Sequence, residues 1–537
     1  MTDSQHSIST AALLALMALL YYLMFLFTPL QVDDLMFAQE YMAVNNGSPE
    51  FSIHGFRDYI LFIRDQINGR LPNMVCAVWV LHLHHAVGSM LLAMATVWMF
   101  MAMNRLAAGR LSLTALSFAW VIGAVLLPWR SGMFITDIAL NYTPVSLALL
   151  WLYREFTSPS GIRLWVVLPI VFVTALLHEG ADIIAIAACG AYALMRRMCL
   201  SRRQWTMAGV FLAGTALLLS SPGIWLRFDG ANAAVISHKS VVMGIPATML
   251  LLSAIILVTA LKPWRGYTGE LLRSPQWLGC VAAAIVGALM QWRLGFAFER
   301  GAWFGELFAC TALLMLITTL AQRLGRRVVI CATALSIILP AALLCGSIVM
   351  QYRADKENSA ILQLLRQSPT GTVFHDLHPR SSRLLLNYPM TYTWLNPDHL
   401  LIVNNGHSTP VAVVPEELSR ASLTAMTTVA GNVGALSFGN SYMLPDRQLN
   451  MLDAHGLPYP DCPIELTSYT YTCADGTVHP DVKTLLQRFT LPDGTRMLLI
   501  RPLVLSLNPP FVNILRVDGA EESPRADGSG RDEDTVL

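Results

Sequence analysis

The distribution of apolar residues divides the chain into two parts. Up to about residue 350, runs of about 20 apolar residues recur between short polar segments, each run long enough to cross a bilayer as a helix. The two shortest runs could instead be partly re-entrant. The pattern predicts a polytopic α-helical membrane module over residues 1–350. We expect eleven spans, near residues 10–30, 86–104, 111–128, 138–153, 164–180, 182–195, 205–221, 241–261, 277–294, 303–321 and 328–349.

Residues 31–85 form a long connection between the first two predicted spans, and we expect this loop to be structured. Part of it carries apolar residues at helical spacing, with Arg and Asp at the other positions. This pattern is typical of an amphipathic helix on the membrane surface. The apolar positions are Phe56, Tyr59, Ile60, Ile63 and Ile67.

After residue 350 the long apolar runs give way to short mixed segments. "GTVFHDL", "HLLIVNN", "TPVAVVP", "RMLLIRPLVL" and "VNILRV" read as strands, and "NSAILQLLRQ" reads as a helix. We expect a small α/β or α+β domain over residues 351–525. The polar, turn-rich residues 526–537 are expected to form a disordered tail.

Composition supports a membrane protein. Of the 537 residues, 54% are hydrophobic and 13% are charged, whereas a soluble protein carries roughly a quarter charged residues. A formal net charge of +1 predicts no nucleic-acid partner. The first apolar run is longer than the core of a signal peptide and lacks a small-residue cleavage site, so we expect it to be retained.

The cysteines follow the same division. Seven of the nine lie in or beside apolar runs, where Cys is usually a packing residue. Cys462 and Cys473 lie in the polar C-terminal part. A disulfide between them is expected if that part is exported to an oxidising compartment, and two free thiols are the alternative.

Charged residues divide between the two sets of loops. One set holds most of the Arg and Lys residues, which places these loops in the cytoplasm. An odd number of spans then puts the N-terminus inside and the chain outside from about residue 350. Nearly all carboxylates of the first 350 residues belong to the opposite side, since the inner loops keep only Glu155 and Glu270. We therefore expect a polar cavity, and any chemistry, at the outer ends of the helices.

Short polar motifs at these outer ends resemble those of a known class. They are Asp33-Asp34, Asn68-Gly69-Arg70, Asp137…Asn141-Tyr142 and Ser221-Pro222-Gly223…Arg227. Their order and shared side resemble the GT-C class of integral membrane glycosyltransferases, which take sugars from polyprenyl-phosphate carriers on the extracytoplasmic face. The resemblance covers about residues 10–350. Ile224 departs from it, because similar proteins often carry Asn after the Pro-Gly.

The resemblance implies a catalytic Asp in the first outer loop. Glycosyl transfer needs a base to take the proton of the acceptor hydroxyl, and Asp33 and Asp34 are the candidates. One could be the base while the other binds a cation or orients the donor. The alternative is a solvated helix cap at the membrane edge.

Arginines on the outer side are candidates for the phosphate of the donor, because the planar guanidinium can bond phosphate through two hydrogen bonds. Their alternative role is that of interfacial anchors; Arg130 is the weakest candidate of this kind. We expect the donor phosphate and substrate to be bound by Asn68, Arg70, Asp137, Asn141, Tyr142, His178, Glu179, Arg227, Arg293, Glu299 and Arg300.

No defined metal motif is present in the sequence. "HEGAD", from His178 to Asp182, lacks the second His of a His-Glu-x-x-His site. We expect no resident metal, although a divalent cation held by His and carboxylates remains an alternative. Trp225 and Trp303 could stack on a sugar instead of anchoring the protein at the membrane interface.

The expected function is inverting transfer of a monosaccharide from a polyprenyl-phosphate donor to a lipid-linked or surface glycan. The resemblance is to bacterial enzymes that modify O-antigen or other surface polysaccharides, and it implies a multi-pass protein of the bacterial inner membrane with a periplasmic active site. An O-antigen polymerase or ligase is the second hypothesis, and a lipid-linked glycan transporter is the third. Transporters hold charges near the bilayer midplane and often show repeated halves, which this sequence does not.

Overall fold

A computed structural model describes most of the first 367 residues and separate strands beyond them. Two compact units are present. One comprises residues 1–28, 57–349 and 382–388, and the other comprises residues 29–56, 350–381 and 389–537. The described residues are 3–28, 30, 33–45, 48–229, 245–294, 299–367, 372–373, 386, 393–396, 399–402, 412–415, 464–472, 478–490, 496–502, 515–516 and 535–536.

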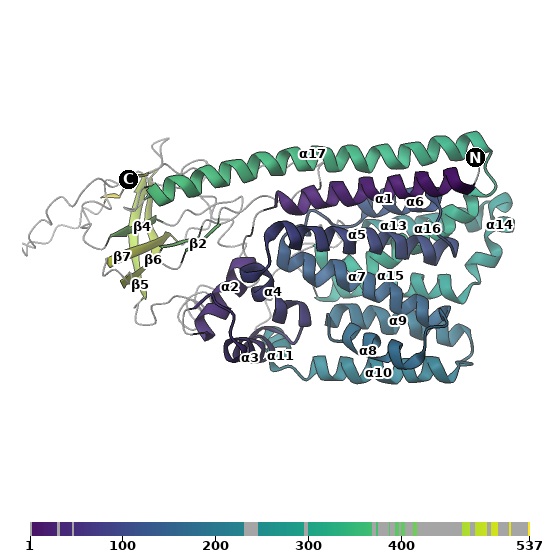
Figure 1. Ribbon diagram of the computed structural model, residues 1–537, viewed down its shortest axis with the longest axis horizontal. Coiled ribbons are helices and arrows are strands. Elements are labelled where there is room, and N and C mark those ends of the chain that lie inside the picture. Colours follow the sequence, from purple (N-terminus) through teal and green to yellow (C-terminus); the bar gives the residue numbers. More distant parts are fainter. Residues whose placement is uncertain are drawn as a thin grey trace, which may run out of the picture. The chain divides into compact units, whose positions relative to one another are not determined.

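The first part of the chain is helical, and each of the eleven predicted apolar runs coincides with a helix (Figure 1). Four helical segments of the described chain are long and apolar enough to cross a membrane: 8–26, 85–108, 300–321 and 326–353. A bent pair, 266–272 with 275–292, makes a fifth if it is one span. The count of eleven crossings therefore stays a prediction. The helices are α1 (Asp3–Leu26), α5 (His85–Ala108), α6 (Leu113–Leu126), α7 (Thr136–Thr157), α8 (Leu164–Thr174), α9 (Glu179–Met195), α10 (Arg202–Leu219), α13 (Pro246–Ala260), α14 (Lys262–Leu272), α15 (Pro275–Leu294), α16 (Trp303–Ala321) and α17 (Arg326–Gln367).

Small residues allow the helices of this unit to approach closely. Helix α5 packs against α1, α7 and α16, and α15 packs against α9 and α16 (Figure 1). A Cβ atom added to Gly287 of α15 would lie 2.5 Å from the Cα of Gly305 in α16. Glycines at such crossings bring two backbones into contact, as in other membrane helix pairs.

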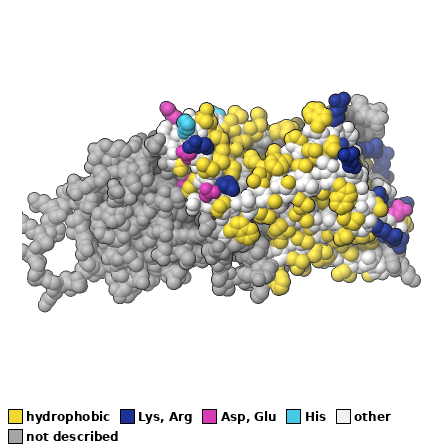
Figure 2. Space-filling model, turned by 90° about the horizontal axis from the view of Figure 1, so that it is seen from below, with side chains coloured by type: hydrophobic (Ala, Val, Ile, Leu, Met, Phe, Trp, Pro, Cys, Tyr) yellow, Lys and Arg dark blue, Asp and Glu magenta, His cyan; other side chains and the backbone are white. Residues whose placement is uncertain are grey.

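Many apolar side chains of the helical unit are exposed. Trp165, Leu194, Ile256 and Leu335 are each at least 64% exposed. Figure 2 shows hydrophobic side chains over the middle of the helical part, with Lys and Arg gathered toward one end of it. An apolar exterior of this extent indicates a lipid environment.

Four helical segments follow α1, within residues 31–85: α2 (Asp33–Val44), α3 (Ile53–Phe62), the π-helix η1 (Ile63–Ile67) and α4 (Leu71–His82). The predicted amphipathic helix corresponds to α3 and η1. Tyr59 and Ile63 on its apolar face are fully buried in protein, and the Tyr59 hydroxyl donates to the carbonyl of Asn73 in α4 at 2.8 Å. This part of the apolar face therefore packs on α4 and not on a membrane.

The C-terminal part contains strands. Five of the predicted strand segments contain β1 (Thr372–Val373), β3 (His399–Ile402), β4 (Ala412–Pro415), β7 (Arg496–Pro502) and β8 (Leu515–Arg516), and the predicted helix 358–367 is the end of α17. Three further strands were not predicted: β2 (Thr393–Asn396), β5 (Ile464–Thr472) and β6 (Val478–Thr490).

A five-stranded sheet has the order β4-β7-β6-β5-β9, and β1-β8 and β2-β3 form separate pairs. Neighbouring strands are antiparallel except β5 and β9, which are parallel. Strand β9 (Thr535–Val536) lies in the tail predicted to be disordered; the rest of that tail is outside the described residues. Cys462 and Cys473 also lie outside them, so their disulfide stays a prediction.

Candidate functional site

The Asn-Gly-Arg motif follows a π turn. The Asn68 N–H donates to the carbonyl of Ile63 at 2.7 Å, which closes η1, and Asn68 itself is extended with φ −172° and ψ 169°. Helix α4 starts at Leu71 with Pro72 in its first turn. Because Pro lacks an N–H, it is well suited to a first turn. The three motif residues therefore lie between η1 and α4. In other proteins, π-helical segments are frequent at functional sites.

The Ser-Pro-Gly motif packs directly against this turn. Ser221, just before α11 (Pro222–Asp229), donates its hydroxyl to the carbonyl of Arg64. A Cβ atom added to Gly223 would lie 2.7 Å from the backbone nitrogen of Ile67, and one added to Gly69 would lie 2.8 Å from the Cβ of Ser221. Gly223 therefore allows its backbone to lie against that of Ile67, and Gly69 leaves room for the Ser221 side chain.

We expect Gly223→Ala to lower the free energy of unfolding by about 1–3 kcal/mol, because the contacted atoms are backbone atoms that cannot rotate away. Gly209→Ala in α10 is the matched control, since a Cβ there has no neighbour within 4 Å. Thermal unfolding of the detergent-solubilised protein measures both. Equal melting temperatures for the two variants would refute the close contact.

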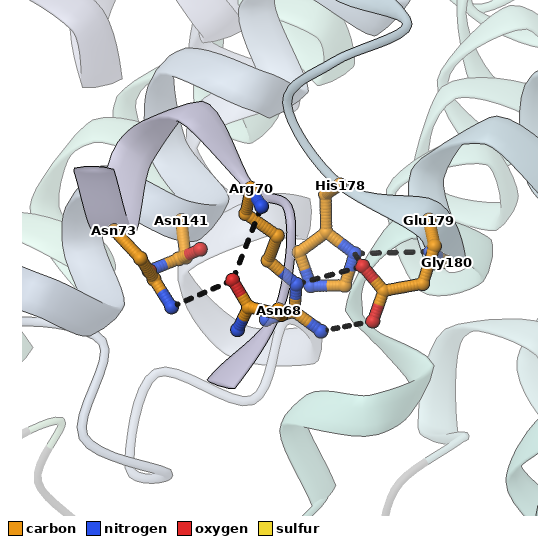
Figure 3. A network of polar contacts seen from close by, with 7 residues as sticks. All are labelled: Asn68, Arg70, Asn73, Asn141, His178, Glu179 and Gly180. Carbon is orange, nitrogen blue, oxygen red and sulfur yellow. Dashed lines mark hydrogen bonds and ion pairs between the residues drawn. The ribbon is translucent and has the colours of Figure 1, made fainter. Parts of the chain in front are cut away.

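Arg70 forms an ion pair with Glu179 at the start of α9 (Figure 3). The Arg70 Nε donates to Glu179 Oε2 at 2.7 Å, and Nη2 donates to Oε1. The backbone is held by the next residue, because the Leu71 N–H donates to the carbonyl of Leu176 at 3.0 Å. The structure thus joins the Asn-Gly-Arg motif to the "HEGAD" segment, as their shared side predicted.

A chain of amides connects Arg70 to α7 (Figure 3). Asn68 Oδ1 accepts from the Arg70 N–H at 3.1 Å and from Asn73 Nδ2 at 3.2 Å. Asn141 Nδ2 donates to Asn73 Oδ1 and, at 3.0 Å, to Asp137 Oδ1. Apart from Arg70, the four residues of this chain, Asn68, Asn73, Asp137 and Asn141, are each at least 95% buried. The network fixes the position of Arg70 from its backbone side.

Asn73 is the member of this network that the sequence analysis missed. Its signal is a lone amide in the otherwise apolar stretch "LPNMVCAVWV" at the start of α4. A buried polar group must find a partner, so such an amide indicates a contact with another element.

His178 caps α9 and packs against two aromatic rings. Its Nδ1 accepts from the Gly180 N–H at 3.0 Å, so in the neutral ring the proton belongs on Nε2. Its ring lies 5.3 Å from that of Tyr142 and 5.0 Å from that of Phe304, measured between centroids. Tyr142 and Phe304 stack on each other at 5.3 Å. Phe304 is a second residue that the sequence analysis missed.

The two tryptophans proposed for sugar stacking differ. Trp303 is fully buried, and its indole N–H donates to Ser146 Oγ at 2.7 Å. A buried core residue can neither stack on a sugar nor anchor the protein at the interface, so both expectations for Trp303 are wrong. Trp225 is 54% exposed and donates to the carbonyl of Leu219 at 2.7 Å.

The Asp33-Asp34 pair belongs to the other compact unit and forms the first turn of α2. Asp34 is fully buried, whereas Asp33 is half-buried. Adjacent helical residues point about 100° apart, which accounts for their different environments. Further along α2, burial raises the pKa of Glu40 to about 9, so this carboxyl is protonated and neutral at pH 7.

The turn after α2 is held by side chains of the same unit. The Tyr41 hydroxyl donates to the carbonyl of Glu50 at 3.0 Å and accepts from the Ser52 N–H at 3.0 Å. Asn45 Oδ1 accepts from the Ser52 hydroxyl at 2.8 Å, and that hydroxyl in turn accepts from the Gly55 N–H at the start of α3. This region is therefore an ordered turn between two helices.

The remaining candidates have no bond to the network around Arg70 that the structure describes. Arg300 Nη1 donates to the carbonyl of Ser131 at 3.2 Å, in the loop before α7. Arg130 in the same loop is exposed. Within the part of the chain that the structure describes, no group of three His, Cys, Asp or Glu residues could hold a metal ion. The side chains of Arg227, Arg293 and Glu299 lie outside the described residues.

No protein-family model, curated protein or solved structure matches this chain.

Proposed function

We propose that this protein is a membrane glycosyltransferase that moves a monosaccharide from a polyprenyl-phosphate donor to a glycan acceptor. The observation that supports the proposal best is the position of Arg70. Arg70 lies at the start of α4, and its side chain is 15% exposed. Its backbone N–H is held by Asn68 Oδ1, which also accepts from the buried amide of Asn73. A partly exposed guanidinium on a fixed backbone is suited to a phosphate.

An apolar groove next to this cluster supports a lipid-linked substrate. It has a volume of about 290 Å³ and lies between α7 and α8. Leu177, one of its lining residues, directly precedes His178. An isoprenoid chain is an apolar occupant of suitable chemistry for such a groove. Its lining residues are Ala148, Pro169, Ile170, Val173, Thr174 and Leu177.

The reaction requires one base and one anion-binding group. In the proposed chemistry, the Asp33 carboxylate takes the proton of the acceptor hydroxyl as its oxygen forms a bond to the anomeric carbon. The bond from that carbon to the phosphate oxygen breaks, and the polyprenyl phosphate leaves with the electron pair. Arg70 stabilises the negative charge of this leaving group. A single displacement of this kind inverts the anomeric configuration.

Asp33 and Arg70 belong to different compact units, so the role of each is proposed from its own surroundings. Asp137, Asn141, Tyr142, His178 and Glu179 are proposed as neighbours of the donor. The divalent cation stays an alternative. The proposed location is the bacterial inner membrane, with the sugar transferred on the periplasmic face.

An O-antigen polymerase or ligase is a second candidate function. Such an enzyme would also use a lipid-linked glycan and outer arginines, so Arg70 alone does not distinguish it. The first-loop acids favour monosaccharide transfer. A transporter would hold charge near the bilayer midplane, whereas Arg70 and Glu179 lie at helix starts.

Comparing surface polysaccharides of a deletion strain with those of the parent tests the proposal. We expect the deletion to remove one side-branch monosaccharide and to leave glycan chain length unchanged, with recovery when the gene is restored. Shortened chains would favour the polymerase, and unligated lipid-linked glycan would favour the ligase. An unchanged glycan of normal abundance would contradict all three enzyme assignments.

A further inference from the structure

The ion pair between Arg70 and Glu179 has the bonding pattern of a phosphate complex. Both carboxylate oxygens of Glu179 accept from one edge of the guanidinium, at Nε (2.7 Å) and at Nη2. Two oxygens of a phosphate bind an arginine in the same two-bond arrangement. A carboxylate and a phosphate would therefore use the same two donors.

The pair is open to a ligand. The side chains of Arg70 and Glu179 are 15% and 20% exposed. A second pair in the same unit, Glu155 with Arg203, provides a contrast because the Glu155 side chain is only 2% exposed and also accepts from the Ser160 N–H at 3.0 Å. The buried Glu155 carboxylate is inaccessible to a ligand, whereas the Glu179 carboxylate is partly exposed.

Both ends of the pair are held independently of the pair itself. The Arg70 N–H donates to Asn68 Oδ1, and the next N–H in the chain donates to Leu176. On the other side, His178 caps α9 through the Gly180 N–H, which fixes the backbone around Glu179. Breaking the pair therefore needs only side-chain rotation, with no change in the helices.

The charges of the pair favour this rotation when an anion binds. Arg70 donates two bonds to the Glu179 carboxylate, and Asp137, another carboxyl of the cluster, accepts from Asn141. While Glu179 is bonded to Arg70, the guanidinium is already neutralised. An incoming phosphate would then meet a guanidinium whose charge is balanced and whose Nε–Nη2 edge is occupied by Glu179.

We infer that Glu179 is an internal competitor that occupies the phosphate-binding edge of Arg70 until a phosphate group displaces it. The inference rests on the proposed role of Arg70, and it adds that Glu179 lowers the affinity of Arg70 for the donor phosphate. The return of Glu179 to Arg70 would help release the polyprenyl phosphate product after transfer. Glu179 thus acts through Arg70 as a positioning residue.

Titration of full-length protein in lipid nanodiscs with farnesyl phosphate, a short polyprenyl phosphate, tests the inference by calorimetry. We expect Glu179→Gln to bind it about tenfold more tightly than the wild type, equivalent to about 1.4 kcal/mol. Glu155→Gln is the matched control, because it removes the same charge from a pair whose carboxylate is buried, and it should leave the Kd unchanged. Glu179→Asp keeps the charge but shortens its reach, so we expect an intermediate Kd.

The outcomes separate the inference from the proposed function. If Arg70→Ala abolishes binding while Glu179→Gln and Glu179→Asp leave the Kd unchanged, competition is refuted and the phosphate site stands. If Arg70→Ala binds normally, the phosphate site itself is refuted. A gain for both farnesyl phosphate and inorganic phosphate would support competition for the phosphate group. A gain confined to phosphatidylglycerol in the discs would overturn the assignment in favour of a bilayer headgroup.

Discussion

Asp33→Asn is expected to reduce sugar transfer by about 10²- to 10⁴-fold, because an amide cannot accept the proton of the acceptor hydroxyl. Asp33 is chosen over Asp34 because it is half-buried, whereas Asp34 is fully buried in the first turn of α2. The measurement is the initial rate of transfer from a polyprenyl-phosphate sugar by the purified protein. The variant should melt at the wild-type temperature, since an isosteric amide at a half-buried position changes little packing.

Asp58→Asn is the control for removal of a carboxylate from the same loop. Asp58 is exposed and paired with its neighbour Arg57, so its variant should transfer sugar at the wild-type rate. Full activity in both Asp33→Asn and Asp34→Asn would refute a base in the first loop. Loss of activity in Asp34→Asn alone, with an unchanged melting temperature, would instead assign the base to Asp34.

Arg70→Ala is expected to reduce kcat by about 10²- to 10³-fold and to raise KM for the donor, because it removes the group that stabilises the departing phosphate. Arg70→Lys should recover only part of the loss, since an ammonium group cannot form the two parallel bonds of a guanidinium. Steady-state kinetics with a polyprenyl-phosphate sugar measure both constants.

Arg57→Ala serves as the control because Arg57 is an exposed cation of the same loop, 66% exposed in its side chain. We expect wild-type kinetics for it. A loss of similar size in Arg57→Ala would indicate a general effect of positive charge near the membrane. Wild-type kcat and KM in Arg70→Ala would remove Arg70 from the donor site.

The helices of this protein follow from local properties of its sequence. Long apolar runs predict helices in a membrane, because only hydrogen bonding within the helix satisfies the backbone there. All eleven runs lie in helices for this reason. Partial two-residue alternation of β5 was also present in the sequence, in "IELTSYTYT", but it is a weaker local signal and was overlooked. Strand β6 lacks this signal, because Val482, Leu485, Leu486 and Phe489 stand at helical spacing.

The grouping of the polar residues was predictable in outline only. The distribution of basic residues, which is a property of the sequence, predicts that they share one side of the membrane. The structure groups Asn68, Arg70, Asn141 and His178 in one cluster, as that sidedness implied. The bonds between these residues could not be deduced from the sequence. A shared side of the membrane specifies the depth of a residue in the membrane, but not its position in the membrane plane.

The sequence by itself therefore determined the helices and the end of the bundle that is polar. Tertiary structure alone decided that Glu179 bonds to Arg70, that Asn73 links Asn68 to Asn141, and that Trp303 is buried. It also decided the contact of Gly223 with Ile67, 156 residues earlier in the chain. The physical reason is that hydrophobicity and helix formation depend on neighbouring residues, whereas these bonds depend on the packing angles between helices distant in sequence.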